Sequence, residues 1–520
     1  MAQHKNGAPP TVFILDFGAQ YSQLIARRTR ELGVYCEIVP HDAPWSALSA
    51  RNPAALILSG GPESTLVDGA PEMDEAILDS GVPIFGICYG MQLLARETGA
   101  ELVKLDHAEY GPANLIVGDR ETPLFDGVPD ESRTWMSHGD SVITLPKGYM
   151  ALASTERCHV AAMGNPDKKI YGTQFHPEVV HTQHGKTILA NFLREIVGLS
   201  DDWKMENFVD RATEEIRAKV GDAKVICALS GGVDSAVAAT LVARAIGEQL
   251  TCIFVDHGLL RKGEPDQVVA AFRDILHLNV VAVDARKRFL KKLRGVEDPE
   301  KKRIIIGHEF IRIFEEEADK IKGAKFLVQG TLYPDVIESK TPGSKAGHKI
   351  KSHHNVGGLP KKMKFKLVEP LRALFKDEVR DLGRVLGLPE HIVKRQPFPG
   401  PGLAVRIIGD ITEDRLDIVR EADAIVREEI DKAPLEPHPW QYFAVLTPVK
   451  SVGVMGDGRT YANLVAVRAI TSEDGMTADW ARLPHELMER ISSRIVNEVQ
   501  GVNRVAYDIT TKPPATVEWE

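Results

Sequence analysis

The hexapeptide Ser230-Gly231-Gly232-Val233-Asp234-Ser235 lies between two segments of opposite character. The apolar residues 225–229 before it predict a buried parallel strand, and residues 236–246 after it predict a helix that ends at Gly247. The glycines allow backbone N–H groups to point inward, and the positive end of the helix dipole adds to the attraction for phosphate. The serines supply hydroxyls, and Asp234 could fix the loop or hold a magnesium ion. The sequence therefore predicts a phosphate-binding loop between a strand and a helix.

This loop contains no lysine, which distinguishes it from a Walker A loop. Gly185-Lys186-Thr187 is excluded as a Walker A loop because Val180 stands where the preceding glycine is needed. The hexapeptide resembles the pyrophosphate loop of the N-type ATP pyrophosphatases, which split ATP between the α- and β-phosphates. An ordinary glycine-rich turn is the alternative. The resemblance implies ATP contacts along the loop, at Ser230, Gly231, Gly232, Val233, Asp234, Ser235 and Ala236.

A second turn, Gly86-Ile87-Cys88-Tyr89-Gly90, follows an apolar predicted strand and precedes a predicted helix. This is the nucleophile-elbow pattern with cysteine in place of serine. The helix N-terminus beneath Cys88 favours a thiolate, which could attack an amide carbonyl. Backbone N–H groups would then hold the oxyanion, and Gly60 and Gly61 at the end of a neighbouring predicted strand are candidates for part of that site.

A cysteine nucleophile needs a base and a group that orients the base, and His176-Pro177-Glu178 offers both. Pro177 stiffens the turn, so His176 and Glu178 can face the same pocket. His176 would transfer the proton and Glu178 would fix its tautomer. A structural cysteine beside a surface turn is one alternative. A zinc site made by His176, His181 and His184 is another, although no cysteine or carboxylate at matching spacing accompanies these histidines.

Together with the motif at 59–62, these residues resemble the class I glutamine amidotransferase family. The resemblance implies that Cys88, His176 and Glu178 form a catalytic triad. It also implies an oxyanion and glutamine-binding site made by Gly60, Gly61, Tyr89, Gln92, Ser137, His138, Gly139 and Asp140. Asp140 suits the α-amino group of glutamine by charge, and a polar loop is the alternative for residues 136–140.

Composition limits the cellular role. The chain has 520 residues and a formal net charge of −9, which argues against a general nucleic-acid binder. Residues 1–10 lack the apolar core of a signal peptide, and no run reaches the roughly 18 apolar residues of a membrane span. The 5 cysteines include no Cys-x-x-Cys pair and favour a reducing compartment. We therefore expect a cytoplasmic protein that acts on small molecules, without nucleic-acid or membrane partners.

Alternating predicted strands and helices indicate an α/β fold with three domains. Residues 1–200 and 201–400 each predict a doubly wound parallel sheet, with a linker at 198–202. Residues 401–520 predict a small α+β domain that begins after the Pro- and Gly-rich segment 398–403. Within it, the sequence predicts a helix at 413–432 and strands at 443–446 and 464–469. Two prolines and a tryptophan in 512–520 indicate an ordered tail laid into a site.

Residues 341–366 are rich in lysine and glycine. They could form a lid that closes positive charge over a triphosphate, or a solvated basic loop. Further along, Phe375-Lys376-Asp377-Glu378 offers carboxylates that could hold magnesium, although the first turn of a helix explains them equally well.

Taken in order, motifs along nearly the whole chain resemble the glutamine-hydrolysing GMP synthase family, including the segments 350–358, 398–403 and 512–520. The resemblance implies that ATP adenylates the 2-oxygen of XMP and that ammonia from glutamine displaces AMP to give GMP. It implies Mg2+ with ATP, for which Asp234 of the phosphate loop is the candidate ligand noted above, and a homodimer through the third domain. It assigns XMP contacts to Arg303, Gln441, Asp457, Lys512 and Glu518, and the lid to Lys351, His353, His354 and Asn355.

Two rival classes remain from the sequence. An NAD synthetase-like amidase–ligase would use a nitrilase-type glutaminase with a Glu-Lys-Cys arrangement, against which the elbow and His176 argue. A non-catalytic nucleotide sensor on the same fold should have lost Cys88, His176 or a residue of the phosphate loop, and none is lost.

Overall fold

The computed structural model describes residues 10–18, 21–118, 120–340, 365–455, 458–472 and 477–520. The proposed lid residues Lys351, His353, His354 and Asn355, and the proposed XMP contact Asp457, therefore lie outside the described residues. The chain forms two compact units, residues 1–208 and 209–520. Among the described residues, no helix is both long enough and apolar enough to cross a membrane.

The N-terminal unit is built on a nine-stranded sheet in the order β2-β1-β3-β4-β9-β8-β7-β5-β6. Pairing is parallel from β2 to β9 and antiparallel from β9 to β6. The strands are β1 (Val12–Asp16), β2 (Cys36–Pro40), β3 (Ala55–Leu58), β4 (Ile84–Ile87), β5 (Leu102–Val117), β6 (Glu131–Val142), β7 (Met150–Ser154), β8 (Ala162–Asn165) and β9 (Ile170–Thr173). The helices are α1 (Ser22–Glu31), α2 (Trp45–Ser49), α3 (Tyr89–Glu97) and α4 (Gly185–Asn191).

This unit confirms the predicted parallel strands. It does not support the alternative that residues 136–140 form a polar loop. Residues 136–140 lie inside β6, so they belong to a strand and not to a polar loop. The segment after the predicted linker also packs on this unit. Trp203 donates its backbone N–H to Gly33 at 2.8 Å and stacks on Tyr35, so the chain leaves the unit only after residue 208.

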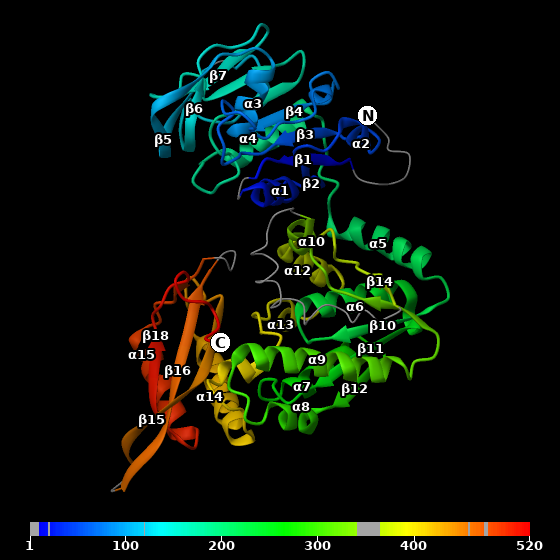
Figure 1. Cartoon of the computed structure of the whole chain (residues 1–520), viewed down its shortest axis with the longest axis vertical. Helices are drawn as coiled ribbons and strands as arrows, with labels where there is room; N and C mark the ends of the chain where they lie inside the picture. The colour runs from blue at the N-terminus through cyan, green and yellow to red at the C-terminus, as the bar shows by residue number, and fades with distance from the viewer. Residues whose placement is uncertain (1–9, 19–20, 119, 341–364, 456–457, 473–476) are drawn as a thin grey trace. The chain divides into compact units, whose positions relative to one another are not determined.

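The C-terminal unit contains a parallel sheet in the order β12-β11-β10-β13-β14. Its strands are β10 (Lys224–Leu229), β11 (Leu250–Asp256), β12 (Val280–Asp284), β13 (Ala324–Val328) and β14 (Lys366–Val368). Its helices are α5 (Met205–Val220), α6 (Val233–Ile246), α7 (Glu264–Ala270), α8 (Arg286–Leu293), α9 (Pro299–Ala318), α10 (Tyr333–Lys340), α12 (Lys376–Val385) and α13 (Glu390–Val393). In Figure 1, α6 and α12 lie on one side of this sheet, and α8 and α9 lie on the other.

A second sheet completes this unit, with the order β15-β16-β17 and β18 beside β16. Its elements are β15 (Gln441–Met455), β16 (Gly458–Thr471), β17 (Asp479–Trp480), β18 (Val502–Asp508), α14 (Glu413–Lys432) and α15 (His485–Glu498). One hydrophobic cluster includes Ile226 and Ile253 of the parallel sheet together with Leu416, Val419 and residues of the second sheet. This shared core explains why residues 209–520 form one compact unit.

The hairpin of β15 and β16 is longer than the predicted strands 443–446 and 464–469. Pro448 lies in this longer strand, although proline cannot donate to a strand ladder. The pairing register shifts between Leu446 and Lys450, and this irregularity accommodates Pro448 in a strand that continues to Met455. The hairpin extends past the ends of α14 and α15 (Figure 1).

Candidate active sites

The cysteine elbow is a strained turn between β4 and α3. Cys88 has φ 52° and ψ −105°, an unusual backbone for a residue with a side chain, and its N–H donates to Thr173 O at 2.7 Å. A Cβ on Gly86 would lie 2.6 Å from the carbonyl carbon of Gly90, and a Cβ on Gly90 would lie 2.4 Å from Leu58 O. The turn is therefore possible only because both of these positions are glycine.

The structure brings the three proposed triad residues together. His176 Nδ1 lies 2.7 Å from Glu178 Oε1, and Cys88 is close enough to the ring to influence its charge. Burial disfavours the charged imidazole, but the Glu178 carboxylate and the Cys88 sulfur favour it and together raise the pKa of His176 to about 11. An imidazolium held beside a sulfur and oriented by a carboxylate is the arrangement that a cysteine nucleophile requires.

Two backbone segments lie next to Cys88: the strand β6 and the loop after β3. The Cys88 thiol lies 3.4 Å from Ser137 O, on β6. Gly90 N–H donates to Ser59 O at 3.1 Å, which joins the start of α3 to the loop after β3. A Cβ on Gly61 would lie 3.1 Å from the Tyr89 ring, so the Gly60–Gly61 backbone runs directly beside the elbow.

The predicted glutamine-binding residues are largely occupied with one another. Gln92 Nε2 donates to Asp140 O at 2.9 Å and to Gln174 Oε1 at 3.1 Å. The His138 ring bonds to Asp140 O at 2.8 Å and to Glu109 Oε2 at 3.1 Å. These contacts make Gln92 and His138 supports for β6, whereas Gly139 has open space where a Cβ would stand.

Sequence reasoning missed Glu109, Ser64 and the role of Gln174 at this site. Ser64 donates to the Asp140 carboxylate, and Gln174 Nε2 lies 3.7 Å from Cys88 Sγ. No motif marks Glu109 or Ser64, because their partners come from strands distant in sequence. Gln174 was detectable, since it stands two residues before His176.

The zinc alternative is wrong. Among the described residues, no group of three His, Cys, Asp or Glu side chains is arranged to hold a metal ion. His176 is bonded to Glu178, and the His181 ring instead stacks on Trp135 at 4.7 Å between centroids.

The phosphate loop has the predicted strand–loop–helix form, with α6 beginning at Val233 and not at Ala236. The hydroxyl oxygens of Ser230 and Ser235 lie 3.1 Å apart, and Ser235 Oγ donates to Gly232 O at 2.9 Å. Lys376 Nζ donates to both carboxylate oxygens of Asp234, at 2.7 and 2.6 Å. The loop therefore lacks its own lysine and receives one from α12.

Residues 375–378 could provide carboxylates for magnesium or form the first turn of a helix, and the contacts of Glu378 distinguish these two interpretations. The backbone N–H of Phe375 donates to Glu378 Oε2 at 2.7 Å, so the Glu378 carboxylate serves the first turn of α12. This supports the helix-turn interpretation. The side chain of this segment that reaches the phosphate loop is that of Lys376, which the sequence did not mark as a site residue.

Magnesium fits this site only together with phosphate oxygens. Asp234 is one carboxylate, and Mg2+ is commonly held by one or two carboxylates plus the phosphates of a substrate. The contact with Lys376 shows that the Asp234 carboxylate already attracts a cation.

Of the described residues proposed to bind XMP, Gln441 and Glu518 contact each other, whereas Arg303 and Lys512 make separate contacts. Gln441 Nε2 donates to Glu518 Oε1 at 3.0 Å, and Glu518 is paired with the fully buried Arg406 at 2.9 Å. Arg303 donates to the backbone O of Glu520. The Lys512 backbone pairs with Ala478, which fixes the start of the tail. Arg406 was not selected from the sequence, although it lies three residues after the Pro- and Gly-rich segment 398–403.

Comparison with known proteins places these sites in a family. Residues 13–196 match the description "Glutamine amidotransferase class-I", residues 428–519 match "GMP synthase C terminal domain", and residues 223–282 match "tRNA methyl transferase HUP domain". The chain is 58% identical to "GMP synthase [glutamine-hydrolyzing]" of Bacillus cytotoxicus, over 98% of this chain and 99% of the relative. The chain belongs to the glutamine-hydrolysing GMP synthase family.

A second relative agrees with this membership in the GMP synthase family. The protein of the same description from Bacillus thuringiensis subsp. konkukian is 57% identical over 98% of both chains. A solved glutamine amidotransferase from Thermotoga maritima is 18% identical, covers 36% of this chain and 99% of its own, and has a TM-score of 0.30.

The contact between Glu178 and His176 leads to a test by pH. In Glu178→Gln the neighbouring negative charge is lost, so the pKa of His176 should fall and the imidazolium should lose its proton at a lower pH. Glutamine hydrolysis should drop about 10²-fold or more, with the alkaline limb of its pH profile moved to lower pH. Initial rates of glutamate formation across the neutral and alkaline range measure both effects. An unchanged alkaline limb would contradict this role of Glu178.

Proposed function

We propose that this chain is a glutamine-hydrolysing GMP synthase, a ligase that takes nitrogen from glutamine and drives its transfer to XMP with ATP. The observation that carries the proposal is the presence, in one chain, of a bonded His176–Glu178 pair beside Cys88 and a Ser-Gly-Gly-Val-Asp-Ser phosphate loop. Its 58% identity to a GMP synthase over nearly its whole length supports the same function.

The N-terminal unit supplies ammonia. The Cys88 thiolate attacks the side-chain amide carbon of glutamine, and the carbonyl oxygen becomes an oxyanion. The backbone N–H groups of Tyr89 and of Gly60 or Gly61 are proposed as the oxyanion site, because α3 begins at Tyr89 and the Gly61 backbone lies beside the Tyr89 ring. His176 then protonates the departing nitrogen, and water hydrolyses the remaining thioester to glutamate. The main-chain acceptor Ser137 O keeps the thiol in place before reaction.

The C-terminal unit activates XMP. The 2-oxygen of XMP attacks the α-phosphorus of ATP, and the bond to the bridging oxygen of the β-phosphate breaks to release pyrophosphate. Ammonia then attacks the adenylated carbon, and AMP leaves to give GMP. Residues 230–236 are proposed to hold the β- and γ-phosphoryl groups, and Lys376 adds positive charge beside them. Magnesium would enter with ATP through Asp234 and supply further positive charge to the departing pyrophosphate.

The division of labour follows the three predicted domains, 1–200, 201–400 and 401–520. XMP contacts are proposed at Arg303, Gln441, Asp457, Lys512 and Glu518, and a lid at Lys351, His353, His354 and Asn355. The contact of Gln441 with Glu518 supports a shared site for two of these residues. Reduced cysteines support a cytoplasmic location, because all 5 are buried and free.

A homodimer is proposed through the C-terminal domain. Val452, Val454 and Tyr461 of the β15–β16 hairpin are 59%, 74% and 69% exposed. Apolar side chains gathered on one exposed hairpin are unusual for a monomer and favour a second copy of the chain as partner.

Substitution of the nucleophile should separate the two reactions. Cys88→Ala should abolish GMP synthesis from glutamine, because the attacking sulfur is gone, and should leave synthesis from added ammonium unchanged. GMP formation with each nitrogen source is the measurement. An equal loss with both sources would refute the assignment of Cys88 to ammonia release alone.

Substitution at the phosphate loop should impair GMP synthesis from glutamine and from ammonium alike. Asp234→Ala deletes the proposed magnesium ligand and the partner of Lys376, so GMP formation should fall about 10²-fold or more with either nitrogen source. Analysis of nucleotide products gives the measurement, with AMP and not ADP expected from the wild-type enzyme. AMP release at the wild-type rate would overturn this role of Asp234.

Substitution on the hairpin tests the dimer. Val454→Glu places a charge at the exposed position and should shift the enzyme to a monomer in sedimentation experiments at micromolar concentration. Ile116→Glu is the matched control, since Ile116 is 46% exposed on β5 of the N-terminal unit. A wild-type mass that is monomeric from the start would refute the dimer.

A further inference from the structure

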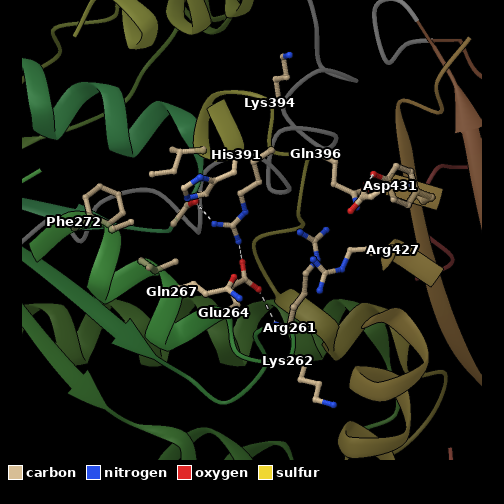
Figure 2. Close-up of a pocket in the computed structure, with 16 residues that line it drawn as sticks. Arg261, Lys262, Glu264, Gln267, Phe272, His391, Lys394, Gln396, Arg427 and Asp431 are labelled. Atoms are coloured by element: carbon tan, nitrogen blue, oxygen red, sulfur yellow. Dashed lines mark hydrogen bonds and ion pairs between the residues drawn. The ribbon is translucent and has the colours of Figure 1, made fainter. Parts of the chain in front are cut away.

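The carbonyl group of Gly231 in the phosphate loop is held from behind by an arginine. Arg395, just after α13, donates from Nη1 to Gly231 O. Both residues line a pocket, and two of its other lining residues, Glu264 and Gln267 of α7, are labelled in Figure 2. Gly231 has φ +74°, and a Cβ there would lie 3.0 Å from both Arg395 Nη1 and Val268 Cγ2. The guanidinium group and α7 therefore fill the space behind the loop.

This contact also sets the direction of the next N–H group. In a trans peptide the C=O and the following N–H point in opposite directions. A Gly231 carbonyl fixed on Arg395 therefore turns the Gly232 N–H toward the side where Ser230 and Ser235 lie. There it makes only a long contact of 3.3 Å with Ser230 Oγ, so an incoming anion can take its place.

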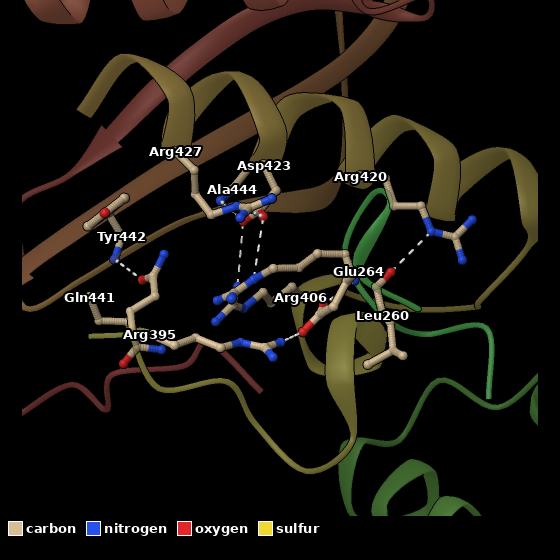
Figure 3. Close-up of polar contacts among 12 residues, drawn as sticks. Leu260, Glu264, Arg395, Arg406, Arg420, Asp423, Arg427, Gln441, Tyr442 and Ala444 are labelled. Atoms are coloured by element: carbon tan, nitrogen blue, oxygen red, sulfur yellow. Dashed lines mark hydrogen bonds and ion pairs between the residues drawn. The ribbon is translucent and has the colours of Figure 1, made fainter. Parts of the chain in front are cut away.

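A second contact fixes the guanidinium group itself. Arg395 Nη2 forms an ion pair with Glu264, the first residue of α7 (Figure 3). Glu264 is 4% exposed, and its Oε2 accepts the backbone N–H of Arg261 at 2.8 Å. The loop after β11 thus determines where Arg395 lies, and Arg395 determines the orientation of a peptide in the loop after β10.

Arg395 remains a cation in this setting. Burial lowers its pKa to about 10, and the neighbouring Arg261 and Arg427 act in the same direction. A charged donor in a desolvated position forms a stronger hydrogen bond than a neutral one.

We propose that Arg395 is a positioning residue for pyrophosphate: it holds the Gly231 carbonyl so that the Gly232 N–H faces the β- and γ-phosphoryl groups of ATP. This inference rests on the proposed function of residues 230–235 as the pyrophosphate loop. It assigns to Arg395 no contact with the substrate.

Product inhibition by pyrophosphate measures the affinity of the loop directly. Arg395→Ala should weaken inhibition of ammonia-dependent GMP synthesis by pyrophosphate about tenfold to a hundredfold, as expected for a lost charged hydrogen bond. KM for ATP should rise in parallel. Arg384→Ala is the matched control, because Arg384 lies on α12 and its ion pairs within the described part of the chain are with exposed Asp381 and Glu390.

Chemical rescue separates positioning from a general structural role. A cavity of about 340 Å3 lies beside Arg395 and has room for a small cation where its side chain is removed. Added ethylguanidinium should restore pyrophosphate inhibition of Arg395→Ala at least in part and should leave Arg384→Ala unchanged. Failure of rescue together with a lowered melting temperature would overturn the proposal in favour of a folding role.

Two further variants complete the test. Arg395→Lys keeps the charge, but one ammonium cannot serve both Gly231 and Glu264, so it should weaken pyrophosphate inhibition less than Arg395→Ala. If Arg395→Ala does not fold, Arg395→Lys takes its place in the experiment. Pyrophosphate inhibition of Arg395→Lys equal to that of the wild type would then overturn the proposal. Ser235→Ala tests the loop itself. If Ser235→Ala leaves pyrophosphate inhibition unchanged, the assignment of the loop fails. If only Arg395→Ala leaves it unchanged, the positioning role alone fails.

Discussion

Both candidate sites depend on a backbone turn that has no room for a β-carbon. At the elbow, Gly86 and Gly90 approach other backbone atoms so closely that any larger residue would collide. At the phosphate loop, Gly231 combines a positive φ with the side chains of Arg395 and Val268 packed against it. In each case the turn ends a parallel strand and starts a helix. The reactive groups consequently lie at the helix N-terminus, where partial positive charge favours a thiolate or a phosphate.

The C-terminal unit adds a second constraint, because two arginines are buried within it. Arg406 and Arg468 have no exposed surface, and each contacts the last residues of the chain. Arg406 pairs with Glu518, whereas Arg468 donates to Thr516 O and Val517 O. Removing one partner of such a buried pair costs about 3–5 kcal/mol. The tail is therefore part of the folded unit and lies beside the residues proposed to bind XMP.

Local patterns were sufficient to predict much of this structure. The apolar runs before Gly86 and Ser230 indicated buried parallel strands, and α14 occupies the predicted residues Glu413–Lys432. Patterns failed where the deciding contact was distant. Residues 136–140 look like a polar loop alone but pair with β5, and Pro448 looks like a strand end but is accommodated by an irregularity in pairing. The division into 201–400 and 401–520 stays a prediction, while the two segments share one hydrophobic core.

The amino-acid sequence alone determined which chemical groups are present: a cysteine elbow, a histidine and glutamate two residues apart, and a lysine-free phosphate loop. Each of these is encoded within a few consecutive residues, so spacing and turn chemistry were sufficient to find it. Only the tertiary structure decided which groups support them. Lys376 reaches Asp234, Arg395 reaches Gly231, and Glu109 reaches His138 from elements far along the chain. A lone lysine, arginine or glutamate leaves no local pattern, because its partner is chosen by the packing of strands and helices and not by its neighbours in sequence.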